Sequence, residues 1–190
     1  VQFNAEPSCR QQQMKSLDSV AEQSLALGLT KSEGSCAVTR LTLALSEAEE
    51  VGKELTVHLH QVGMLILRTG GVMVSVAPSL CFVSWNTSST CSNHIEQCNV
   101  FLFMLSDEYA GHAGASSGEL LHGKVSAGCQ RYAINYGKAL DLSLALALQA
   151  EVLQVFALAG GRVGEYISHQ QKKSPLMLTV QGKEEEVARI

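Results

Sequence analysis

Three residues in one polar stretch have types and a spacing that could hold a metal ion. Cys91, His94 and Cys98 form a Cys-x2-His-x3-Cys cluster, and Cys81 lies ten residues before it. Thiolates and imidazoles are ligands that zinc prefers, and a structural zinc site uses four ligands. The spacing lacks the second ligand pair, at a fixed interval, that a zinc finger or ribbon has. Zinc bound by these four side chains is one of three interpretations.

The same residues permit two other interpretations. Asn86 begins an N-glycosylation sequon, and in an oxidising compartment Cys91 and Cys98 could form a disulfide. Three cysteines, Cys81 among them, lie among apolar residues, as free buried thiols often do; the other two are Cys36 and Cys129. We therefore expect free thiols with no metal or other cofactor. The localisation stays open, with an intracellular compartment favoured slightly over secretion.

A second candidate site lies in a stretch rich in glycine, serine and histidine. The sequence predicts a loop over 107–118, followed by a helix that Ser116 and Glu119 would cap. Free amides at a helix N-terminus attract anions, so this loop could bind a ligand. The glycine spacing matches neither a dinucleotide fingerprint nor a P-loop, and we assign no catalytic residue. The candidate ligand-binding residues are Gly111, His112, Gly114, Ser116, Ser117, Gly118 and His122.

Two histidines lie two residues apart in a segment that alternates in polarity. On a strand, His58 and His60 would share one face, and Leu55, Val57 and Leu59 would share the other. The leucine and valine face must be the core side, since no other apolar face is available there. We therefore predict that both imidazoles lie on a solvated face and bind no metal.

Hydrophobic periodicity predicts one α+β domain over residues 1–190. Apolar residues recur at helical spacing in 9–52, whereas 54–105 contains alternating or continuous apolar runs that are typical of antiparallel strands. Helical patterns return in 117–170, and a late strand is expected near 176–180. We expect an antiparallel sheet that the two helical regions cover.

The composition excludes several classes of protein. The chain of 190 residues is 46% hydrophobic and 17% charged, which is typical of a globular protein and not of a disordered one. Its net charge is −4 and its basic residues are scattered, so we expect no nucleic-acid partner. The most apolar segment, 139–160, is interrupted by Asp141 and Glu151, which favours a buried helix over a membrane span.

The sequence is consistent with three functions. The low charge and the absence of a convergent catalytic set favour a non-enzymatic assembly module, self-associating as a homo-oligomer or within a larger protein assembly. The first alternative is an enzyme or small-ligand-binding protein that uses the 107–122 loop. The second alternative is a secreted, glycosylated protein that contains a disulfide. Whether the chain is an enzyme is left open.

Overall fold

The computed structural model describes residues 29–41, 48–77, 79–109, 112–127, 130–150, 154–158, 161–171 and 176–190. Strands and helices are interspersed along these ranges. In chain order the elements are β1 (Leu29–Arg40), α2 (Ala48–Thr69), β2 (Val72–Ala77), β3 (Leu80–Trp85), α3 (His94–Tyr109), β4 (His112–Ala127), β5 (Gln130–Tyr136), α4 (Lys138–Gln149), β6 (Val155–Leu158), α5 (Arg162–Gln171), β7 (Leu176–Val180) and β8 (Lys183–Arg189). Within these ranges no helix is long and apolar enough to cross a membrane.

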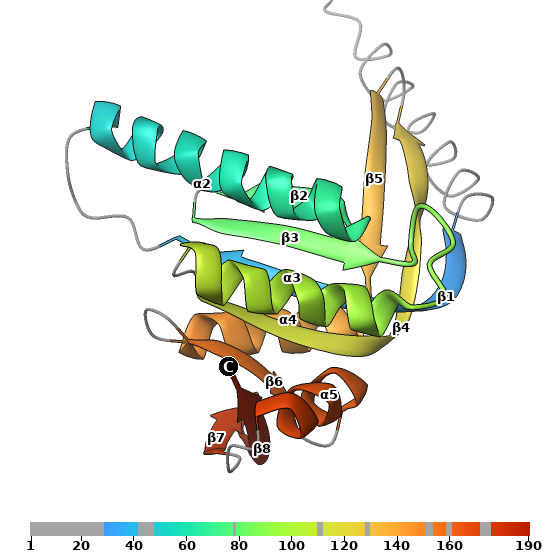
Figure 1. Ribbon diagram of the computed structural model, residues 1–190. Coiled ribbons are helices and arrows are strands. Elements are labelled where there is room, and N and C mark those ends of the chain that lie inside the picture. Colours follow the sequence, from blue (N-terminus) through green and yellow to red (C-terminus); the bar gives the residue numbers. More distant parts are fainter. Residues whose placement is uncertain are drawn as a thin grey trace, which may run out of the picture.

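The strands form one sheet with a long central ladder. Their order is β2-β3-β1-β4-β6-β8-β7, and β5 pairs with β4 outside this path (Figure 1). Neighbouring strands are antiparallel except β4 and β6, which are parallel. β1 and β4 form the longest ladder, from Leu29 opposite Gly123 to Arg40 opposite His112. The other strands extend the sheet on both sides of this pair.

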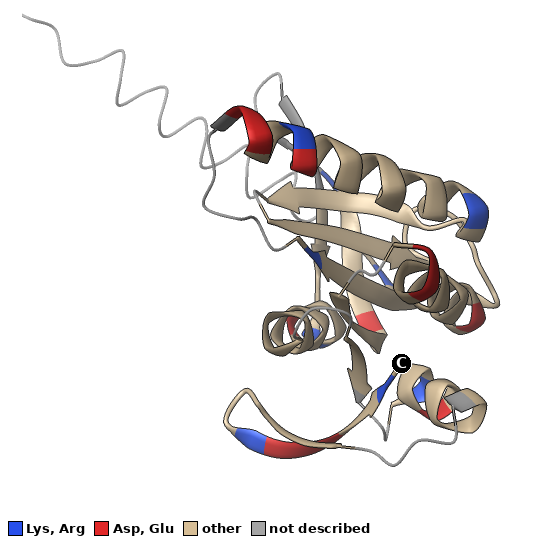
Figure 2. Cartoon of the chain, turned by 60° about the vertical axis from the view of Figure 1, so that its left-hand side comes forward, with Lys and Arg blue, Asp and Glu red and all other residues tan. Residues whose placement is uncertain are grey.

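Helices cover both faces of the sheet. α2, α3 and α5 pack on one face and α4 packs on the other (Figures 1 and 2). Successive residues of a strand point to opposite faces, and this alternation produces the two layers. In β6, Val155 and Ala157 join the core beneath α2, α3 and α5, whereas Phe156 joins the core beneath α4. Charged residues lie mainly outside these cores, at the ends of α2 and on the hairpin of β7 and β8 (Figure 2).

Trp85 joins three elements on the face covered by α2 and α3. Its ring is fully buried and meets Phe101 of α3 edge-on, with 5.2 Å between the ring centroids. Its indole N–H donates a hydrogen bond of 3.1 Å to the carbonyl of Thr69, the last residue of α2. A Cβ at Gly71 would lie 2.8 Å from this ring, so the chain between α2 and β2 needs glycine there.

The contact between α4 and β4 is so close that it excludes any side chain at position 114. A Cβ on Gly114 would lie 2.3 Å from both the Ser143 carbonyl oxygen and the Ala147 amide nitrogen of α4. The Ser143 hydroxyl also donates a hydrogen bond of 3.1 Å to the carbonyl of Cys36 in β1. The helix therefore lies directly against the backbone of the two central strands.

The predicted α+β class is confirmed, as are the predicted strands that correspond to β2, β3 and β7. The assignment of 54–69 to strands is wrong, because this segment is the larger part of the 22-residue helix α2. The six alternating residues 55–60 suggest a strand. Glu49 and Glu50 in the first turn and Arg68 in the last turn nevertheless suit the dipole of one long helix. Residues 99–105, which lie within the region predicted to form strands, are likewise helical in α3, since a continuous apolar run does not distinguish a buried helix from a strand.

The two regions expected to be helical contain strands as well. Residues 29–40 form β1, and 112–136 contain β4 and β5, although the sequence predicts a helix from about residue 36 and another from about 117. The helices predicted further along are present as α4 and α5, but the helix expected over 139–160 ends at Gln149, and residues 155–158 of that segment form strand β6. A continuous apolar run does not distinguish a buried helix from a strand. The first predicted helix, at 9–27, lies outside the described residues.

β1 and β4 escape prediction because serine, glycine and alanine are frequent in them, where strands are usually recognised by β-branched residues. β5 does alternate, with Tyr132, Ile134 and Tyr136 at every second position, but it lies within the segment predicted as helix.

Replacing Gly114 by alanine should destabilise the protein by about 2 kcal/mol or more, because backbone atoms of α4 block the new methyl group. Gly63→Ala is the matched control. Gly63 lies within α2, and among the described residues no heavy atom beyond the neighbouring backbone of that helix lies within 4 Å of the place that a Cβ would take, so this change should stabilise the helix by about 0.5–1 kcal/mol. Urea unfolding of both variants measures the difference, and equal stabilities would contradict the close contact of α4 with β4.

Candidate functional site

The structure does not gather the four candidate zinc ligands into a metal site. The His94 ring lies with Nδ1 2.9 Å from the Ser35 hydroxyl, and Cys98 and Cys81 are fully buried in the core. Cys91 is partly exposed, and its thiol is free, as are those of Cys81 and Cys98. Among the described residues, no three histidine, cysteine or acidic side chains are placed to hold a metal ion.

The sequon asparagine has a structural role in the turn after β3. Asn86 adopts a positive φ of 64°. Its side-chain amide donates to the Glu33 carbonyl at 2.7 Å, and its side-chain oxygen accepts a hydrogen bond of 2.7 Å from the Cys91 amide. These bonds connect β1 to the start of α3 and leave the Asn86 side chain engaged within the fold.

The glycine- and serine-rich stretch predicted as a loop is mostly strand. From His112 onward it forms β4, whose backbone groups pair with β1 along the whole length of that strand. His112 and Ser116 are buried, and Gly114 lies against α4. Gly111 lies outside the described residues. The remaining candidates line two different hollows, with Ser117 and Gly118 in one and His122 in the other.

The hollow that contains Ser117 and Gly118 lies at the N-terminus of α4, and we call it the α4 hollow. Its volume is about 620 Å³. It is lined by Ser117, Gly118, Glu119, Leu121, Tyr136, Gly137, Lys138, Ala139 and Leu142. Residues from β4, β5 and α4 therefore meet in one place. Only Ser117 and Gly118 among them are candidates from the sequence.

The N-terminus of α4 presents positive charge to the α4 hollow. The residue before the helix, Gly137, has a φ of 154° and supplies no side-chain cap. A Cβ at this position would also lie 2.6 Å from the Glu119 carbonyl oxygen, so glycine is required. Uncapped amides carry part of the helix dipole, and Lys138 adds a full charge on the first helical residue. This end of the hollow suits an anion.

The other side of the α4 hollow is apolar. Leu121 and Tyr136 are direct partners across the β4–β5 ladder, and 38% and 63% of their surfaces are exposed. Leu142 of α4 completes this wall. Large exposed apolar side chains of this kind often contact a ligand or another protein chain. The hollow thus combines an anion-binding end with an apolar surface.

The α4 hollow has one carboxylate, and it is already paired. Glu119 lies 2.6 Å from the Lys31 ammonium group, and both side chains are largely exposed. Asp141 lies in the first turn of α4 but does not line the hollow. The described residues of this hollow therefore offer anion-binding groups and no set of acidic metal ligands.

Histidines from α2 and β4 lie together where β1 ends. The His58 ring, with Nε2 3.1 Å from the Thr39 hydroxyl, is buried on the inner side of α2. The strand prediction for this segment places both His58 and His60 in solvent, but the helical turn directs only His60 outward. Burial lowers the pKa of His58. Burial also lowers the pKa of His112, and the nearby charges of Arg40 and His58 lower it further.

Comparison with known proteins identifies the fold. No model of a known protein family matches the chain, and no curated protein matches its sequence. The guanylate cyclase domain of RhGC from Catenaria anguillulae, solved in complex with GTP, matches with a TM-score of 0.69 at 10% identity, over 84% of this chain and 96% of that one. The adenylyl cyclase CyaB from P. aeruginosa matches with a TM-score of 0.62 at 13% identity, over 86% and 95%.

A third match is to a dimer. The dimeric guanylyl cyclase domain of the RhoGC fusion protein from the aquatic fungus Blastocladiella emersonii has a TM-score of 0.66 at 10% identity, over 85% of this chain and 99% of that one. The chain therefore has the fold of adenylyl and guanylyl cyclase catalytic domains.

This fold corrects the leading functional prediction. A non-enzymatic assembly module is expected from a sequence that shows no convergent catalytic set, but the fold is that of catalytic domains. The likeness favours the first alternative, an enzyme or small-ligand-binding protein that uses the 107–122 segment. That segment supplies Ser117, Gly118 and Leu121 to the α4 hollow.

The buried histidines predict that the protein loses stability in mild acid. Burial lowers the pKa values of His58, His94 and His112 below the usual value of about 6.5. Above that pH the rings are unprotonated in both the folded and the unfolded chain, so their contribution to stability is fully present. As the pH falls below about 6.5 the unfolded chain binds protons that the folded chain does not, and the free energy of unfolding decreases.

Chemical unfolding measured from pH 7.5 to 5 checks this expectation. The slope of the free energy of unfolding against pH should become shallower in His58→Gln, because one buried titrating group is removed. His60→Gln, a change on the exposed side of the same helix, is the control and should leave the slope as it is. A stability that does not depend on pH in this range would show that the buried rings are protonated without cost.

Proposed function

We propose that this chain binds a purine nucleoside triphosphate in the α4 hollow and forms one half of a dimeric nucleotide cyclase. The observation that carries the proposal is the meeting of an uncapped helix N-terminus, Lys138 and an apolar wall in a hollow of about 620 Å³. A site of that size is large enough for a small-molecule ligand. The cyclase fold supports the choice of ligand, since one matched domain was solved with GTP.

The two ends of the α4 hollow suit the two ends of a nucleotide. The first amides of α4 and the Lys138 ammonium group would bind phosphate oxygens, as helix N-termini do in many proteins. Tyr136 and Leu121 would cover a face of the purine, because aromatic and aliphatic surfaces favour contact with a flat base. Ser117 lines the same hollow, and its hydroxyl would bond to the ribose or to a phosphate.

The proposed reaction is an internal phosphoryl transfer. The ribose 3′ oxygen attacks the α-phosphorus, the bond from that phosphorus to the pyrophosphate oxygen breaks, and the hydroxyl proton is lost to solvent. Negative charge develops on the leaving pyrophosphate, so fixed positive charge lowers the barrier. In this chain the α4 amides and Lys138 would provide that charge and hold the phosphates in line.

The described residues do not fit a resident divalent metal ion. Magnesium in phosphoryl-transfer sites is held by carboxylates. Here the α4 hollow contains only Glu119, which is paired with Lys31. Glu33, opposite Glu119 in the β1–β4 ladder, is paired with Arg162 and does not line the hollow. We therefore assign this chain the binding and orientation of the nucleotide.

The nucleotide proposal predicts that Lys138→Gln weakens nucleotide binding without lowering the stability of the fold. Binding of fluorescent GTP or ATP analogues should weaken by about three- to tenfold, because a phosphate contact is lost. The free energy of unfolding should not decrease, since a cation at a helix N-terminus opposes the dipole. Lys183→Gln, at the turn between β7 and β8, is the control and should change neither quantity.

Equilibrium titration followed by fluorescence anisotropy measures these affinities. Unchanged affinity in Lys138→Gln would remove the α4 hollow from consideration. Failure of the unmodified protein to bind any purine triphosphate at millimolar concentration would overturn the proposed function itself.

The dimer proposal predicts that a second copy closes the α4 hollow, so that the apolar wall contacts the purine and the second copy together. The chain should sediment as a dimer at micromolar concentration, and Tyr136→Asp should shift it toward the monomer, because a carboxylate would be buried in the interface. Met177→Asp is the matched control, since Met177 of β7 is 57% exposed and does not line the α4 hollow. A monomer at all accessible concentrations would contradict this proposal.

A further inference from the structure

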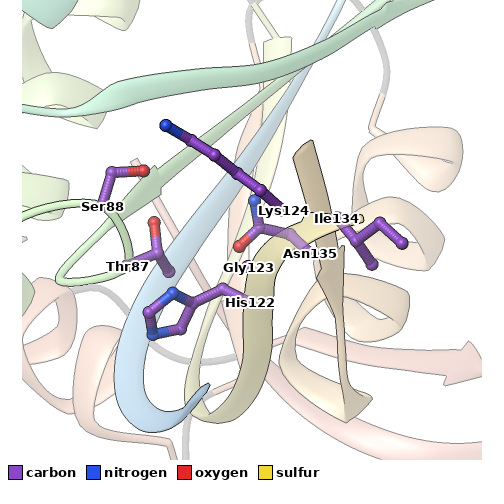
Figure 3. A pocket seen from close by; sticks show the side chains of 7 residues that line it. All are labelled: Thr87, Ser88, His122, Gly123, Lys124, Ile134 and Asn135. Atoms are coloured by element: carbon purple, nitrogen blue, oxygen red, sulfur yellow. The ribbon is translucent and has the colours of Figure 1, made fainter. Parts of the chain in front are cut away.

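A second hollow lies where β4 and β5 meet the turn after β3, and we call it the His122 hollow (Figure 3). It consists of two adjoining spaces of about 460 and 260 Å³ that share Thr87, Ser88 and His122. The larger space is also lined by Gly123, Lys124, Ile134 and Asn135. The smaller space adds hydroxyl groups from Thr30, Ser32, Ser89 and Thr90, together with Asn86.

The His122 hollow is separate from the α4 hollow. His122 pairs with Asn135 in the β4–β5 ladder, and the next pair is Leu121 with Tyr136. Successive residues of a strand point to opposite sides, so the first pair and the second pair face different spaces. The two hollows have no lining residue in common. The two-stranded ribbon therefore has a polar side and an apolar side.

Two buried polar atoms on this ribbon have no hydrogen-bond partner among the described residues. They are Nε2 of His122 and the side-chain oxygen of Asn135. A buried polar atom without a hydrogen-bond partner destabilises the folded state unless something bonds to it. The residues are adjacent across the ladder and line the same hollow, so one bound molecule could satisfy both once these enclosed side chains turn toward it. The Asn135 oxygen requires a donor, such as a hydroxyl group.

The part of the hollow between Lys124 of β4 and the turn after β3 favours negative charge. Figure 3 shows the Lys124 ammonium group and the hydroxyls of Thr87 and Ser88 facing the same space from two elements. Thr87 is buried, and its hydroxyl lies 2.7 Å from that of Ser84, which fixes its position. Neither of the two linings contains an aspartate or a glutamate. An anionic oxygen group placed here would meet donors and no repelling carboxylate.

We propose that the His122 hollow binds a small phosphorylated polyol, of the class of the sugar phosphates. The phosphate would lie beside Lys124 and Ser88, and the polyol hydroxyls would donate to Asn135 and bond to His122. A nucleotide is disfavoured, because the lining provides no phenylalanine, tyrosine or tryptophan ring for a base, and only the small ring of His122. Free phosphate alone would fill little of the volume and would leave the Asn135 oxygen without a strong donor.

Calorimetric titration of the full chain with three probes tests this proposal. Ribose 5-phosphate should bind at least about tenfold more tightly than inorganic phosphate or ribose, because only it engages both sides of the hollow. Lys124→Gln should weaken ribose 5-phosphate binding by about tenfold, and Asn135→Leu should remove the preference over inorganic phosphate. Lys183→Gln and Lys138→Gln are controls that should leave binding unchanged, which also separates this site from the proposed nucleotide site.

Three results would overturn the proposal. One is equal affinity for inorganic phosphate and ribose 5-phosphate, which would assign the site to a simple anion. Another is the absence of binding by every probe at millimolar concentration. The third is binding that Lys124→Gln does not weaken. Lys124 is exposed, so this variant is expected to fold and provides a clear result even if Asn135→Leu does not.

Discussion

The fold depends on the direct contact between the α4 helix and the backbone of β4 at Gly114. Because Gly114 has no Cβ, α4 can approach the central strands closely enough for Ser143 to bond to the backbone of β1. This contact fixes the axis of α4, and with it the position of its uncapped N-terminus beside β4 and β5. The geometry of the α4 hollow is thus a consequence of a glycine that does not line it. The small residues that permit the contact are the same ones that give the segment the composition of a loop.

The sequence is sufficient to predict the class of the fold but not the identity of several elements. Apolar alternation identifies β2 and β3 correctly, because each strand is short and bounded by turn residues. It fails over 54–69, because a few alternating residues are a weaker signal of secondary structure than the charges at the two ends of the longer helix. β1 and β4 escape prediction because they lie at the centre of the sheet, and close helix packing there favours Ala, Gly and Ser over β-branched residues.

The site is harder to predict than the fold, because its residues come from three elements. Ser117 and Gly118 are candidates because of their place before an expected helix, although the helix that matters is α4, which begins about twenty residues later. Tyr136 and Leu121 carry no motif, and only the β4–β5 register brings them together. Lys138 has a recognisable signal, since a cation at the start of a helix opposes the dipole. The cysteine cluster has a suggestive spacing, but helix α3 turns Cys98 into the core and His94 toward Ser35.

The central strand β1 shows how this chain balances stability against charge. Its inner face carries Ser35 and Thr39, each beside the ring of a buried histidine, in a place where a carboxylate would be costly to bury. Burial keeps those rings neutral near pH 7 by lowering their pKa values, so the centre of the sheet has hydrogen bonds and little charge. Positive charge lies instead at the surface of the β4–β5 region, on Lys124 and Lys138, where solvent removes that cost. In this arrangement the core stabilises the fold without buried charge. The ribbon and the start of α4 carry the exposed positive charge on which both binding proposals depend.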